Sequence, residues 1–155
     1  MNTNYLLPNK LKLLGWLLFG VGLLSGIVLY AIGYDGELMV TRVFSIYSDP
    51  FLGDAGFFKI VENGIADELV FICIIIGGLL VGFTKEKVED EYIYKLRTES
   101  LVWAIIFNYA LLLFTIVFVY DMTFFNVLIF NVFTPLLFFV FRFNFIKFKS
   151  AGHEE

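Results

Sequence analysis

The chain has 155 residues, 59% of them hydrophobic and 19% aromatic, and its formal net charge is −4. A soluble domain is about 45–50% apolar, and the excess in this chain lies in long uncharged blocks, which is typical of a membrane protein. The acidic balance provides no basic stripe for a nucleic acid, so we expect no nucleic-acid partner. With a single cysteine and a single histidine, Cys73 and His153, we expect no internal disulfide, no metal site, no catalytic site and no cofactor.

Four apolar blocks approach the roughly 20 residues that a helix needs to cross a bilayer. The predicted membrane-spanning helices cover residues 13–32, 68–83, 101–120 and 124–141. The first block is longer than the apolar core of a cleaved signal peptide, so we expect it to be retained. Backbone polar groups in lipid must be satisfied within their own segment, which favours helices. The predicted fold class is therefore all-α, with four transmembrane helices in one antiparallel bundle over residues 1–155.

The positive charges of the loops predict the orientation. Nine of the eleven lysines and arginines lie before residue 13, in residues 84–100, or after residue 141, whereas Arg42 and Lys59 lie between the first two blocks. The positive-inside rule then places both termini and residues 84–100 in the cytoplasm. Residues 33–67 become an external segment, parts of which are apolar enough to lie on the membrane surface.

Residues 84–100, which we call the stalk, contain neither glycine nor proline and are expected to continue the third helix into the cytoplasm. Three consecutive acidic residues lie in the stalk close to Lys85 and Lys87. One interpretation is a solvated helix with paired charges. The other is a docking site for a cytoplasmic protein, with the candidate residues Glu89, Asp90, Glu91, Tyr92 and Arg97.

Polar residues within the last two apolar blocks form a second candidate site. Asn108 lies in the third block, and Asn131 and Thr134 lie in the fourth, just before Pro135. An amide that faces lipid leaves hydrogen-bonding groups unsatisfied, so both asparagines are expected to face other helices. They would either bond between helices or line a polar intramembrane pocket.

Glycines spaced four residues apart occur in the first two blocks. Gly22 and Gly26 form one such pair, and Gly78 and Gly82 form the other. Small residues at this spacing let two membrane helices approach closely, so we expect these glycines to face neighbouring helices.

The second half of the chain resembles a group of small four-span bacterial membrane proteins of unknown function. The likeness rests on residues 85–93, Leu96-Arg97, Glu99-Ser100-Leu101, Trp103-Ala104, Asn108-Tyr109, Asn131 and Phe133-Thr134. The first half is similar only in hydropathy. The resemblance implies a multi-pass protein of the bacterial inner (plasma) membrane. A looser likeness, to membrane proteins with an Asp-Glu segment before a span, implies a small helix-turn-helix regulator as partner, but the long stalk and long external loop depart from it.

Two functional hypotheses follow. The first is a non-enzymatic integral membrane protein that signals to, or anchors, a cytoplasmic protein through its stalk. The alternative is a small transporter or channel subunit with a path lined by Asn108, Asn131 and Thr134. Four spans are few for a pathway through one molecule, so this alternative requires a homo-oligomer. In both hypotheses the lipid bilayer is the first partner.

Overall fold

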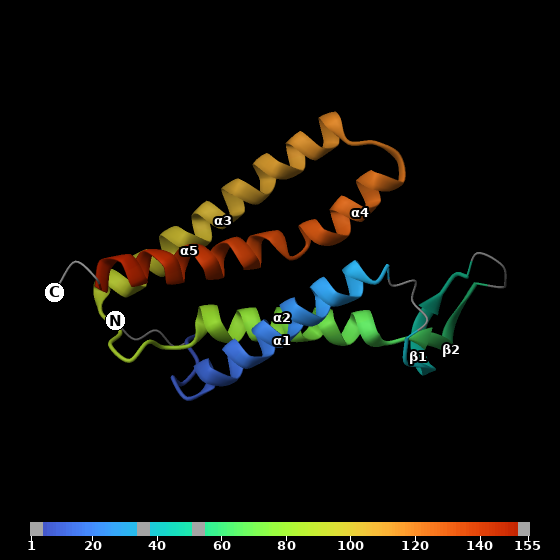
Figure 1. Cartoon of the computed structure of the whole chain (residues 1–155), viewed down its shortest axis with the longest axis horizontal. Coiled ribbons are helices and arrows are strands. Elements are labelled where there is room, and N and C mark those ends of the chain that lie inside the picture. The colour runs from blue at the N-terminus through green and yellow to red at the C-terminus, as the bar shows by residue number, and fades with distance from the viewer. Residues whose placement is uncertain (1–4, 34–37, 51–54, 152–155) are drawn as a thin grey trace.

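The structure, a computed structural model, describes residues 5–33, 38–50 and 55–151. Its elements are, in chain order, α1 (Leu11–Ala31), β1 (Val40–Ser48), β2 (Gly56–Gly64), α2 (Ala66–Phe83), α3 (Glu91–Phe118), α4 (Asp121–Asn131) and α5 (Thr134–Ala151). The predicted predominance of helix is confirmed. Figure 1 shows that α1 begins, α3 begins and α5 ends at one end of the molecule, which we call the basal end, whereas β1 and β2 lie at the other.

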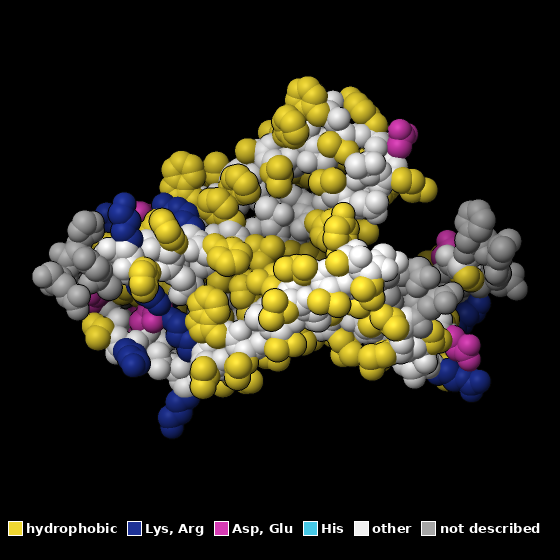
Figure 2. Space-filling model, in the orientation of Figure 1, with side chains coloured by type: hydrophobic (Ala, Val, Ile, Leu, Met, Phe, Trp, Pro, Cys, Tyr) yellow, Lys and Arg dark blue, Asp and Glu magenta, His cyan; other side chains and the backbone are white. Residues whose placement is uncertain are grey.

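Several helices are long and apolar enough to cross a membrane. Among the described residues these are α1, α2 and α3, and the bent pair α4–α5 meets the same criterion when it is taken as one broken segment. In Figure 2 hydrophobic side chains cover the middle of the visible face, and lysines and arginines gather towards the basal end and again near the strands. This banding agrees with the hydropathy of the sequence.

Glycines bring α1 and α2 into close contact. A Cβ added at Gly22 would lie 2.9 Å from the backbone nitrogen of Ile74, and one at Gly15 would lie 2.9 Å from that of Val81. The two backbones therefore touch at positions where any larger residue would force them apart. The prediction that the paired glycines face other helices is confirmed: Gly78 meets Leu136 of α5 and Phe19 of α1, and Gly82 meets Phe139 of α5.

The core lies in the basal half, where α5 packs against α2 and α3. Its most buried side chains, each at most 1% exposed, are Phe19, Val81, Ala104, Phe139, Val140 and Phe143. Phe107 of α3 stacks on Phe138 of α5 with ring centroids 4.6 Å apart. Beyond this contact α3 diverges from α5, and α4 bends towards the end of α3, to which a loop connects it (Figure 1). The far half of α3 consequently exposes apolar side chains such as Leu113 and Phe118.

The external segment is where the all-α prediction is wrong. Residues 40–48 and 56–64 form an antiparallel hairpin in which Val43 pairs with Val61 and Phe44 pairs with Ile60. β-branched and aromatic residues suit a pleated strand, and their cross-strand pairs stabilise the hairpin. One face of the hairpin carries four apolar side chains that are 66–73% exposed: Phe44, Ile46, Phe58 and Ile60.

The fourth predicted block, residues 124–141, is interrupted. The axes of α4 and α5 meet at 45°, and Pro135 is the second residue of α5. Proline has no N–H, so the carbonyl of Asn131 loses its helical donor and the helix breaks there. After the break α5 runs past residue 141 to Ala151, beyond its predicted end.

The stalk is only partly helical, which corrects the prediction for residues 84–90. These residues form no helix, and α3 begins at Glu91, where the Asp90 carboxylate accepts the N–H of Ile93 at 2.8 Å. An aspartate at this position satisfies an otherwise unpaired N–H of the first turn, so it favours a helix start. From Glu91 onwards the helix continues without interruption to Phe118, as predicted for residues 91–100.

Candidate functional site

The segment before α1 is bound to the end of α2 at the basal end. The Leu7 N–H donates to the carbonyl of Phe83 at 2.9 Å, and the Lys85 N–H donates to the carbonyl of Leu7 at 2.9 Å. The Asn9 side chain adds a bond to the Lys85 carbonyl at 2.6 Å. Residues 7–9 therefore fix the loop that follows α2, and this loop carries the charged residues of the stalk.

Glu86 is the centre of the first charge cluster. The Nζ atom of Lys147 donates to its Oε1 at 2.8 Å, and Lys12 donates to the same oxygen. The Glu86 and Lys12 side chains are only 12% and 14% exposed. Burial alone raises the pKa of the Glu86 carboxyl, but the hydrogen bonds and charges of the two lysines lower this pKa by more. The ionised carboxylate thus joins the start of α1, the stalk and the end of α5.

A second cluster joins Glu89 to Arg97. Both guanidinium Nη atoms donate to the carboxylate, with Nη2 at 3.2 Å from Oε2, and Nη2 also lies 3.4 Å from the carbonyl oxygen of Thr84. The guanidinium lies 5.1 Å from the centre of the Phe143 ring, and the Arg97 side chain is 3% exposed. A bidentate pair this buried holds the stalk against α5. It presents little surface to a partner.

The candidate docking residues therefore separate into two groups. Glu89 and Arg97 are held inside the molecule, and Asp90 caps α3. Glu91 and Tyr92 are exposed on the first turn of α3. Lys95 and Glu99 continue the same exposed side of the helix, where their charged atoms lie 4.0 Å apart. We call these four residues, Glu91, Tyr92, Lys95 and Glu99, the stalk face.

Several residues that form contacts at the basal end are not among the candidate site residues predicted from the sequence. Lys12, Glu86 and Lys147 form the first cluster, and Arg142 donates to the Ser100 hydroxyl at 2.9 Å. Each lies within a few residues of the predicted end of an apolar block. The signal that could have found them is that the positive-inside rule predicts these block ends on the same side, so opposite charges there can meet.

The polar intramembrane residues are not joined to one another. Asn108 Oδ1 and Asn131 Nδ2 are buried and have no hydrogen-bond partner among the described residues. The Thr134 hydroxyl, at the start of α5, lies 3.4 Å from the carbonyl oxygen of Phe130 in α4. The bonds between helices expected for the asparagines are therefore not formed within the described part of the chain.

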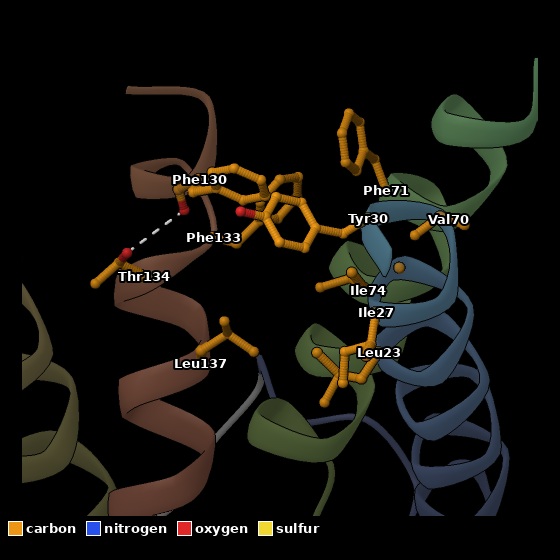
Figure 3. A pocket seen from close by; sticks show the side chains of 11 residues that line it. Leu23, Ile27, Tyr30, Val70, Phe71, Ile74, Phe130, Phe133, Thr134 and Leu137 are labelled. Carbon is orange, nitrogen blue, oxygen red and sulfur yellow. Dashed lines mark hydrogen bonds between the residues drawn. The ribbon is translucent and has the colours of Figure 1, made fainter. Parts of the chain in front are cut away.

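An apolar cleft separates the α1–α2 pair from the α4–α5 bend (Figure 3). It has a volume of about 460 Å³, and Leu23, Ile27, Tyr30, Phe71, Phe133 and Thr134 are among its lining residues. The rings of Tyr30 and Phe130 meet edge to face across it at 6.0 Å. Of the three residues predicted to line a polar path, Thr134 lines this cleft, whereas Asn108 and Asn131 do not.

Within the described residues no group of three His, Cys, Asp or Glu side chains could hold a metal ion, and His153 lies outside them. Comparison of the chain with protein-family models, curated proteins and solved structures finds no match.

Proposed function

We propose that the chain is a four-span, non-enzymatic protein of the bacterial inner membrane, in which α1, α2, α3 and the bent pair α4–α5 each cross the bilayer. The apolar length of these helices supports the four crossings, and the lysines and arginines of the basal end support cytoplasmic termini. The resemblance to small four-span bacterial proteins is part of the same proposal.

The topology is tested by fusing one reporter to the carboxyl terminus and another within the β1–β2 hairpin. A cytoplasmic reporter at the terminus should be active, and a reporter that works only outside should be active in the hairpin. The opposite result at either site contradicts the proposed orientation.

The proposed function is to anchor, or signal to, a cytoplasmic protein through the stalk face. The observation that carries it is the division of the stalk charges: Glu86, Glu89 and Arg97 are paired inside, whereas the stalk face stays exposed at the start of a long helix. The internal pairs fix the position of this face relative to the apolar helices. A partner bound there would be held at a constant distance from the bilayer.

The test is recovery of bound protein from solubilised membranes. The triple variant Glu91→Ala, Tyr92→Ala, Lys95→Ala removes most of the stalk face without touching the two internal clusters. A matched variant, Arg42→Ala with Glu62→Ala, removes an exposed ion pair of the hairpin at the other end. A partner that is lost from the first variant and kept by the second supports docking, and equal recovery from both contradicts it.

The alternative, an oligomeric transporter or channel subunit, is favoured by the two unpartnered amides. Asn108 and Asn131 each keep a buried polar atom without a partner among the described residues, and a second copy or a polar solute would supply one. Cross-linking would show whether an oligomer forms. Solute flux into vesicles should then fall in the Asn108→Leu variant, and an unchanged flux removes the alternative.

A further inference from the structure

We propose that a basic pocket at the basal end binds the phosphate headgroup of an anionic phospholipid from the inner leaflet. The pocket has a volume of about 550 Å³ and lies between the start of α1, the loop after α2 and the end of α5. Its polar lining consists of Asn9, Lys10, Lys12, Glu86, Lys87 and Lys147. No residue of the stalk face lines this pocket.

The charge of the pocket is strongly positive. Four lysines and one glutamate line it, so the balance is three positive charges, and Glu86 is already bound by two of the lysines. Lys10 and Lys87 have no ion-pair partner within the described residues. The first turn of α1 contains no acidic residue, so the positive end of its helix dipole adds to the same field. The positive charge of the pocket thus exceeds what its own acidic side chain balances.

The apolar part of the lining favours a lipid over a soluble anion. Leu13, Trp16 and Val88 also line the pocket and are 71%, 40% and 73% exposed. Leu13 begins the uncharged run of α1, so the pocket lies where the membrane helix meets the headgroup layer. A phosphodiester held by the lysines would leave its acyl chains along the exposed apolar side of α1. Basic pockets between membrane helices on the cytoplasmic side are known to suit such headgroups.

The proposal rests on the membrane insertion of α1 proposed above, but not on the docking of a protein partner. It is tested on the purified full chain in detergent micelles. Phosphatidylglycerol, phosphatidylcholine or inorganic phosphate is added in turn, and the rise in unfolding temperature gives an apparent affinity. Because no partner protein is present, the outcome is independent of the stalk-face experiment.

The decisive variant is Lys10→Gln with Lys87→Gln, because these two lysines lie outside the Glu86 cluster. The matched control is Lys95→Gln with Lys149→Gln, which removes the same charge from exposed positions away from the pocket. Each lysine near a phospholipid surface contributes roughly a five-fold gain in affinity, so the pocket variant should bind phosphatidylglycerol roughly 25-fold more weakly. The control variant should bind it as the natural chain does.

Phosphatidylglycerol should stabilise the natural chain, whereas phosphatidylcholine and inorganic phosphate should not. An equal rise in unfolding temperature with the two lipids would overturn the proposal, because binding would then not depend on the charge of the headgroup. An equal loss of affinity in both variants would also overturn it, because binding would then depend on net charge and not on the pocket. Stabilisation by inorganic phosphate alone would also overturn it, because the occupant would then be a soluble anion. The unfolding temperatures without lipid should be the same in all three proteins, which shows that the variants fold.

Discussion

Replacing Arg97 by methionine tests whether the second charge cluster holds the basal end together. Methionine keeps most of the buried length of the side chain but removes the guanidinium. Glu89, which is 17% exposed, would then keep its negative charge with no cation beside it. Removing one partner of a buried pair usually costs about 3–5 kcal/mol, mostly because the remaining charge is left uncompensated.

The structure points to the lower end of that range. The Glu89 carboxylate retains some contact with water and still accepts the N–H of Glu86 at 2.9 Å, so part of its charge stays solvated. Methionine also keeps an apolar contact with Phe143 while losing the cation–π attraction, which is worth about 0.5–2 kcal/mol. We expect Arg97→Met to lower the free energy of unfolding by about 3 kcal/mol.

The assay is reversible unfolding in mixed micelles, followed by the loss of helical circular dichroism. Lys95→Met is the control, because Lys95 is 74% exposed and its substitution should change the unfolding free energy by less than about 0.5 kcal/mol. Adding Glu89→Gln to Arg97→Met should recover part of the loss, since the orphaned charge disappears. Two results would refute the conclusion that the Glu89–Arg97 pair stabilises the fold. One is a loss of unfolding free energy below about 1 kcal/mol for Arg97→Met, and the other is strict additivity of the two substitutions in the double variant.

Two further predictions concern other parts of the fold. The pKa of the Glu86 carboxyl is lowered in the folded state, so the stabilisation that its charge gives is complete above the ordinary value of 4.5 and is lost as the pH falls through the lower folded-state pKa. The free energy of unfolding, measured between pH 6 and pH 3, should show this loss. Glu86→Gln should make the free energy of unfolding depend less on pH over the same range. Gly22→Ala should lower the unfolding free energy by about 1–3 kcal/mol, because its new Cβ would meet the backbone of α2. Gly20→Ala is the control and should not lower the unfolding free energy, because a Cβ added there meets no atom of another helix within 4 Å. Equal effects of the two alanines would contradict the close approach of α1 and α2.

The helices were predictable because their signal is local. About 20 uncharged residues in a row already indicate a membrane helix, and α1 and α2 begin within two residues of their predicted starts. The break before α5 follows from Pro135, whose missing N–H leaves the Asn131 carbonyl without its helical donor. The size of the bend depends on packing against other helices, which no local pattern contains.

The hairpin and the basal end were less accessible to sequence reasoning. The hairpin requires residues 40–48 to pair with residues 56–64. The mixed polarity of each stretch alone predicts a segment on the membrane surface and does not indicate which stretch is its partner. A helix over residues 84–100 predicts exposed charges along the stalk. Arg97 is buried only because Glu89 and α5 lie against it, and both contacts depend on the tertiary fold.

The Glu86 cluster also bears on the order in which the protein can be completed during synthesis. Lys12 and Glu86 are both present once α1 and α2 have been synthesised, whereas Lys147 follows Glu86 by 61 residues and is made later. An early hairpin of α1 and α2 would therefore hold the Glu86 carboxylate with one lysine instead of two. The second lysine can reach Glu86 only when α5 has packed against the rest of the molecule, so this contact forms late in folding.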